Sequence, residues 1–188
     1  MKLIRTIRLD PSDTFVFERA AEPGEWAVSG AFIFAEAGPD TMNGKTRAAF
    51  RSGFLGVASM GWSTLVQVVV ASETDRAALV ETLANTLCER FGAPDRGSAL
   101  AAAEEEVAFA ASLCDHPADT LVAVRRTFEG GGIREAFRTL QPRGARKPMR
   151  AFSFIEVQGE LEVQGEEEAP GDDVNLVRLA KEKPRSET

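Results

Sequence analysis

The sequence predicts an α+β domain over residues 1–157, with a largely antiparallel sheet packed with two main central helices, followed by a flexible acidic C-terminal tail over residues 158–188. Three observations lead to this prediction. Short segments near both ends of the domain alternate apolar and polar residues, as strands do. Two long segments in the middle of the chain place apolar residues at helical spacing. The tail is rich in acidic residues and poor in apolar ones, so it cannot pack a core of its own.

Strands are expected on either side of the central helices. Apolar residues alternate over residues 2–9, 14–19 and 26–34, and turn-forming residues separate these segments. This pattern predicts an N-terminal antiparallel meander. Residues 120–128 and 133–140 form a second alternating pair joined by a glycine-rich connection, which predicts a β-hairpin with a slightly long loop.

Two long helices are predicted between these strands. In residues 73–91, leucine and phenylalanine recur every four positions, and Ser72 followed by Asp75 has the spacing of a capping box. Ser98 can cap the second helix, in which Glu104–Glu106 form a charged arc that is expected to face solvent.

A short helix and a central strand precede the long helices. Thr41 or Asn43 can cap a helix that ends near Arg51, because Ser52 and a glycine follow it. Residues 63–71 are apolar on nearly every position of both faces. Such a strand is typical of the centre of a sheet that is covered on both sides.

The charge of the chain is uneven. Its net charge of −7 argues against nonspecific binding of nucleic acid. Residues 121–150 nevertheless hold eight basic against two acidic residues. Arginines on neighbouring strands can form a fork-shaped site for a phosphate or carboxylate. The simpler interpretation, which we favour, is that they pair with Glu129, Glu135 and the acidic tail. The candidate ligand-binding residues are Arg125, Arg126, Arg134, Arg138, His116 and Trp62.

Known catalytic and nucleotide-binding motifs are incomplete in this chain. The spacing of Gly56, Gly61 and Ser63 imitates a Walker A loop, but Trp62 stands in place of the lysine and a β-branched run follows instead of a helix. Cys114 and His116 are two apart at a helix end, where their side chains point in different directions, and they are too few for a zinc site. We therefore predict no catalytic residues, no metal and no cofactor.

The expected compartment is the cytosol. The N-terminal residues interleave charged and apolar side chains without the apolar run of a signal peptide, and no segment approaches eighteen apolar residues. We expect a protein that is neither secreted nor associated with a membrane. Cys88 and Cys114 are expected to be reduced, packed thiols.

The C-terminal residues contain a last expected strand and a candidate docking helix. Residues 151–157 alternate as a strand does, and residues 158–173 read as an acidic linker. A short amphipathic helix is expected to follow, and it would form chiefly when it docks into an apolar groove on this domain or on a partner. Its docking residues are Val174, Leu176, Val177 and Leu179.

Three segments resemble a family of short uncharacterised proteins from alphaproteobacteria. They are residues 47–68 (RAAFRSGFLGVASMGWSTLVQV), 109–117 (FAASLCDHP) and 133–140 (IREAFRTL). The likeness covers about residues 1–157 and is looser in the tail. Genes of this family stand near those for a biotin/lipoate ligase-like protein and for formate dehydrogenase accessory factors. The resemblance implies a cytoplasmic accessory or redox-enzyme maturation role and supplies no catalytic residues.

Together these observations predict a non-enzymatic accessory or protein-interaction factor with a protein partner. The alternative is a small anionic-ligand-binding protein or an enzyme that uses the arginines of residues 125–150 and His116. A closed polar pocket in which Arg126, Arg134 or Arg138 converges with His116 would favour the alternative. A shallow surface with an exposed apolar patch would favour the interaction factor.

Overall fold

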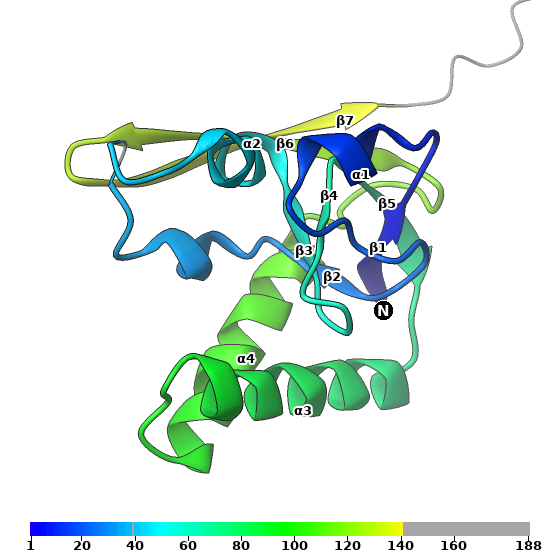
Figure 1. Cartoon of the computed structure of the whole chain (residues 1–188). Helices are drawn as coiled ribbons and strands as arrows, with labels where there is room; N and C mark the ends of the chain where they lie inside the picture. The colour runs from blue at the N-terminus through cyan, green and yellow to red at the C-terminus, as the bar shows by residue number, and fades with distance from the viewer. Residues whose placement is uncertain (39, 141–188) are drawn as a thin grey trace, which may run out of the picture. The chain divides into compact units, whose positions relative to one another are not determined.

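The computed structural model describes residues 1–38 and 40–140, which form two antiparallel sheets and four α-helices (Figure 1). This confirms the predicted α+β class. The expected strand over residues 151–157 and the whole acidic tail lie outside the described residues. Within the described part of the chain, the helices are too short or too polar to cross a bilayer.

The larger sheet has the strand order β1-β5-β6-β7, formed by β1 (Lys2–Ile7), β5 (Leu65–Val70), β6 (Leu121–Glu129) and β7 (Gly132–Leu140). Strand β5 pairs with β1 on one side and with β6 on the other, so its predicted central position is confirmed. Val66 and Val68 of β5 are fully buried. Among the described strands, only β6 pairs with β7, so the other edge of β7 is open there.

The smaller sheet consists of β2 (Ala27–Val28), β3 (Phe54–Gly56) and β4 (Trp62–Ser63), in that order. Only Thr64 separates β4 from β5, so one bent segment contributes a strand to each sheet. Trp26, just before β2, forms an antiparallel bridge with Arg5 of β1. The chain connection at Thr64 and the Arg5–Trp26 bridge therefore link the two sheets to each other at two places.

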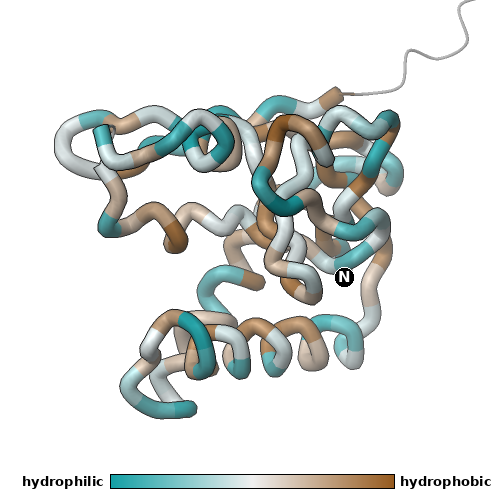
Figure 2. Tube along the Cα trace, in the orientation of Figure 1, coloured by the Kyte–Doolittle hydropathy of each residue, from teal (hydrophilic) through white to brown (hydrophobic). Residues whose placement is uncertain are grey.

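Two long helices, α3 (Glu73–Arg90) and α4 (Arg96–Ser112), follow each other and pack together, and α4 rises from the end of α3 to contact β1 and β2 (Figure 1). Hydrophobic and hydrophilic residues alternate along α3 (Figure 2), and its apolar side buries Leu79, Val80, Leu83 and Ala84. The predicted capping box is confirmed, because Ser72 and Asp75 exchange hydrogen bonds. Helix α4 starts earlier than expected. Its cap is Asp95, whose carboxylate accepts from both the backbone and the hydroxyl of Ser98.

The short helix α2 (Gly44–Ser52) is capped by Asn43, whose side-chain oxygen accepts from the Thr46 N–H at 2.8 Å. Of the two caps that the sequence allowed, the structure uses this one. Phe50 of α2 stacks on Phe128 of β6 with ring centroids 4.4 Å apart. This contact fixes α2 on the inner face of the larger sheet.

The strand expected over residues 14–19 is instead a single helical turn, α1 (Ser12–Val16). Its Asp13 carboxylate is buried and accepts hydrogen bonds from the backbone and hydroxyl of Thr64. Phe17 is fully buried while Phe15 is 73% exposed, so the two rings do not share a face as alternation implied. A contact with a residue far along the chain has overridden the local pattern.

The strand expected over residues 26–34 is also shorter than predicted. Strand β2 ends at Val28, and a 3-10 helix, η1 (Ala31–Phe34), follows Gly30. Gly30 has φ +75°, in the left-handed region that glycine adopts at no steric cost, and a Cβ there would lie 2.6 Å from the Cβ of Leu55. The reversal of the chain at Gly30 ends the strand.

The β6–β7 hairpin is confirmed, with a tighter loop than expected. Glu129 pairs with Gly132, so only Gly130 and Gly131 form the connection. Both have positive φ, +60° and +82°. A two-residue turn with two left-handed residues matches the twist of the flanking strands and favours glycine at both positions.

Candidate functional site

Three of the candidate arginines lie on one exposed face of the β6–β7 hairpin. Arg125 of β6 is opposite Ala136, which lies between Arg134 and Arg138 in β7, so each of these arginines is a diagonal neighbour of Arg125. All three side chains are exposed. We call Arg125, Arg134 and Arg138 the arginine face. It is a basic surface on a chain with a net charge of −7.

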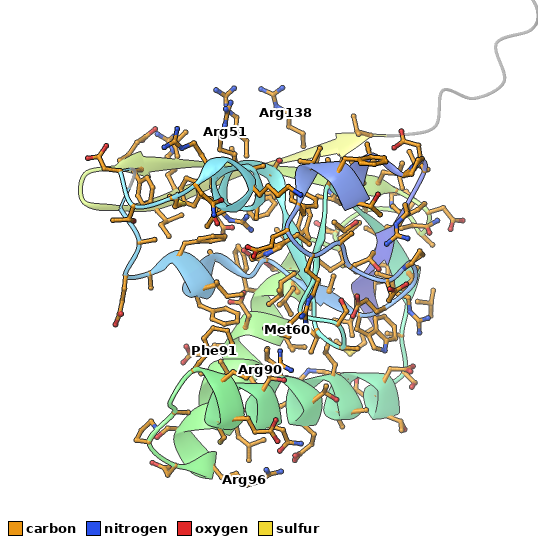
Figure 3. All side chains as sticks on the ribbon, viewed as in Figure 1. Arg51, Met60, Arg90, Phe91, Arg96 and Arg138 are labelled. Atoms are coloured by element: carbon orange, nitrogen blue, oxygen red, sulfur yellow. The ribbon has the colours of Figure 1, made fainter. Side chains whose placement is uncertain are left out.

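One of the three arginines of the arginine face is paired with an acidic residue of the hairpin. Arg134 donates to the Glu129 carboxylate at 2.7 Å, as the simpler interpretation of the sequence expected. Arg51 of α2 projects from the same side of the molecule as Arg138 (Figure 3).

Arg126 lies on the opposite face of β6 and is 1% exposed. Its Nε donates to Glu135 at 2.7 Å, and its Nη1 donates to the carbonyls of Phe50 and Gly53 at 3.1 and 2.7 Å. Nη2 donates to the carbonyl and the hydroxyl of Ser29 at 2.5 and 3.1 Å. All five N–H donors of the guanidinium thus have protein acceptors. A ligand would have to displace one of them to bind Arg126.

One further residue, Glu106, lies beside this interior site, and we call Arg126, Glu135, Ser29 and Glu106 the Arg126 cluster. The Ser29 hydroxyl donates to Glu135 at 2.5 Å, and Glu106 accepts from the Gly30 N–H at 2.9 Å. Glu106 is half-buried, whereas the sequence pattern had placed Glu104–Glu106 in solvent. The other two glutamates of that run are exposed.

The ionisation of Glu106 should make stability depend on pH. Burial raises the pKa of Glu106 above its ordinary value of 4.5, the Gly30 hydrogen bond opposes this rise, and the Glu135 carboxylate adds to it. At pH values between the ordinary and the raised pKa, the folded state keeps a proton on Glu106 that the unfolded chain has already lost. The contribution of Glu106 to stability is therefore fully present below the ordinary pKa and is lost as the pH rises through the raised pKa.

We expect the Glu106→Gln variant to gain stability relative to the wild type as the pH increases from about 4 to 7, since glutamine still accepts from Gly30 but carries no charge. Urea unfolding of both proteins at several pH values measures the difference. Glu105→Gln, at an exposed position of the same helix, is the control and should track the wild type. A constant difference between wild type and Glu106→Gln would show that Glu106 titrates normally.

Trp62 belongs to the core. Its ring stacks on Phe34 with centroids 5.2 Å apart, and it packs against both hydrophobic clusters of the described residues. A Cβ added at Gly53 would lie 2.8 Å from the indole, so the glycine leaves room for the ring. The segment before Trp62 is a tight connection between β3 and β4.

His116 lies after α4, at the end of β6 remote from the Gly130–Gly131 turn, and its carbonyl accepts from the Lys2 ammonium. The six residue steps from Thr120 to Arg126 correspond to about 20 Å of strand. The structure therefore does not bring His116 together with Arg126. Neighbouring Cys114 is buried, and burial raises the pKa of its thiol to about 11. Such a thiol is almost wholly protonated at neutral pH and is a poor nucleophile.

The candidate residues thus divide among three places, namely the arginine face, the interior around Arg126 and Trp62, and the loop of His116. Within residues 1–38 and 40–140, no three His, Cys, Asp or Glu side chains are close enough to hold a metal ion. Anion binding by the candidate residues stays a prediction. The docking residues Val174, Leu176, Val177 and Leu179 lie outside the described residues.

Comparison with protein families matches residues 1–156 to a family of unknown function, DUF6505. The chain belongs to this family. All six candidate ligand-binding residues lie inside the DUF6505 segment, while the four docking residues lie beyond it. Searches of curated proteins and of solved structures gave no match. Membership in DUF6505 agrees with the expected relation to an uncharacterised family and assigns no activity.

Sequence reasoning missed two members of the Arg126 cluster. Glu135 becomes a neighbour of Arg126 as soon as a two-residue turn at Gly130–Gly131 is assumed, because the register then follows. Ser29 and Glu106 carry no comparable signal. Ser29, 97 residues before Arg126, accepts its hydrogen bond, and Glu106 accepts from Gly30, the residue next to Ser29. Only the folded chain brings these segments together.

Proposed function

We propose that this protein acts in the cytosol as a non-enzymatic accessory factor that binds an acidic protein partner through the arginine face. The observation that carries the proposal is the placement of Arg125, Arg134 and Arg138 on one exposed face of the hairpin. Positive charges grouped on an exposed surface attract an acidic partner and determine how it docks. Because Arg126 and Trp62 are packed in the interior and His116 is remote from Arg126, the alternative anion site has less support.

The open edge of β7 supports the same proposal. It presents the backbone groups of a nine-residue strand beside the arginine face, and no described strand covers them. An extended acidic segment could pair with this edge while its carboxylates contact Arg138. We include in the proposal a role in maturation of a redox enzyme, which rests on the resemblance described above.

Affinity purification of the tagged full-length chain from its source organism tests this function. We expect a co-purifying acidic protein that the wild type retains and the Arg125→Ser/Arg138→Ser variant loses, with weaker retention of the wild-type complex at high salt. The matched control is Arg76→Ser/Arg90→Ser on α3, which removes the same charge elsewhere.

The control variant should retain the partner. If the face variant retains the same proteins as the wild type, the arginine face is not the interface. The identity of the partner tests the finer proposal, because a redox enzyme or one of its assembly proteins would support a maturation role.

A further inference from the structure

A cavity of about 230 Å³ lies between α3, β1 and the segments before β2 and after β3. This volume is below the range of about 300–1,000 Å³ that is common for drug-sized ligands, so it suits a smaller molecule. The cavity is lined by Arg5, Gly24, Glu25, Trp26, Val57, Ala58, Ala78, Leu79 and Thr82. Most of these residues offer apolar surface, and Arg5 offers the only positive charge among the lining residues.

The guanidinium of Arg5 is held in position on one side only. It lies 3.8 Å from the centre of the Trp26 ring, and its Nη1 donates to the Gly24 carbonyl at 3.3 Å. Stacking on an indole restrains the plane of a guanidinium and leaves the N–H groups at its rim free to bind in that plane.

The Nε of Arg5 is buried and has no hydrogen-bond partner among the described residues. A buried donor without an acceptor is unfavourable, since it has lost its water and gained nothing in return. Arg8 Nε shares this state, but Arg8 does not line the cavity. The rim formed by Nε and Nη2 of Arg5 is the part of a guanidinium that pairs with both oxygens of a carboxylate.

The acidic residues near Arg5 are committed to other donors. The Glu25 carboxylate accepts from the backbone N–H groups of Glu22 and Ser59 at 2.7 and 2.8 Å, and from the Ser59 hydroxyl. Asp75 attracts Arg5 electrostatically, but its carboxylate accepts hydrogen bonds from Ser72 in the capping box of α3. No ion pair joins Arg5 to an acidic residue in the part of the chain that the structure describes.

We propose that this cavity binds a small carboxylate with an apolar body, whose two oxygens pair with the Arg5 guanidinium and whose apolar part contacts Trp26, Val57 and Leu79. A ligand oxygen would supply the acceptor that Arg5 Nε lacks, after a small rotation of the side chain. The site is separate from the arginine face and does not depend on the proposed protein partner.

Binding is tested on the full chain with benzoate and hexanoate as probes, and with benzamide and hexanamide as neutral analogues of the same shape. NMR titration follows the Arg5 Nε–H and the Trp26 indole N–H signals. We expect both carboxylates to shift these signals and to bind at least about tenfold more tightly than the amides, as hydrogen bonds to charged groups predict.

Three variants locate the binding. Arg5→Gln should weaken carboxylate binding about tenfold or more by removing the charge. Ala78→Leu should weaken it by filling the cavity from an exposed helix position, with Arg5 left intact. Arg90→Gln, at an exposed position of the same helix, should bind like the wild type.

The proposal is overturned if neither carboxylate shifts the two signals up to its solubility limit. It is equally overturned if the amides bind as tightly as the carboxylates, or if Ala78→Leu keeps wild-type affinity. Because Ala78→Leu does not touch Arg5, the test stands even if the Arg5 variant fails to fold.

Discussion

Replacing Arg126 with methionine is expected to destabilise the folded domain by about 3–5 kcal/mol, which is the usual loss when one partner of a buried ion pair is removed. Methionine fills similar space but offers no donor to the carbonyls of Ser29, Phe50 and Gly53. It also leaves the Glu135 carboxylate, which is 15% exposed, without its cation. Urea unfolding of the full chain measures the loss.

Two controls separate the buried ion pair from a general effect of losing an arginine. Arg125→Met changes the adjacent exposed residue and should alter stability by less than about 0.5 kcal/mol. Adding Glu135→Gln to Arg126→Met should recover part of the loss, because it removes the uncompensated charge. Equal stabilities for the Arg125 and Arg126 variants would contradict the energetic role assigned to Arg126.

Replacing Gly61 with alanine is the second large expected loss, about 3 kcal/mol, at the upper end of what overpacking costs. A Cβ at this position would lie 2.4 Å from the Ala20 carbonyl oxygen and 2.6 Å from the Ala21 nitrogen. These are backbone atoms, fixed by the hydrogen bond from Ala21 N–H to the Trp62 carbonyl at 2.9 Å. No side chain can rotate away to relieve the contact.

The matched control makes the same chemical change where there is space. A Cβ at Gly44, the first residue of α2, meets nothing within 4 Å. Gly44→Ala should therefore be neutral or stabilising by up to about 1 kcal/mol, because alanine restricts the unfolded chain. Thermal unfolding followed by circular dichroism compares the two variants. A similar midpoint for both would show that the backbone near Ala20 can move aside.

The long helices and the hairpin could be predicted because their signals are local. Leucines at four-residue spacing, the Ser72 and Asp75 box, and alternation on either side of Gly130–Gly131 each specify an element without reference to the rest of the chain. The α+β class followed from these elements. The helix start at Asp95 was missed because Ser98 and Asp95 are both good caps, and the choice depends on how the preceding loop leaves α3.

The N-terminal segments could not be predicted in the same way. Residues 14–19 are too few for their apolar pattern to distinguish a single helical turn from a short strand. The hydrogen bonds that Thr64 donates to Asp13 favour the helical turn. The candidate site shows the same limit. Arg126 shares a face of β6 with the buried Val122 and Val124, but the carbonyls that accept its hydrogen bonds come from α2 and from Ser29, far away in the sequence. The cavity beside Arg5 had no signal in the sequence, because its walls come from α3, from β1 and from the segments before β2 and after β3.

The Arg126 cluster also imposes an order of events while the chain is being made. The ribosome delivers the carbonyls of residues 29–53 first, and their donor and its counter-charge follow at residues 126 and 135. Since 135 minus 53 is 82 residues, the delay is about 4–16 s at the usual elongation rates of about 5–20 residues per second. During this time the nascent N-terminal segment cannot complete its interior. The packing around Arg126 is therefore complete only after the hairpin has emerged.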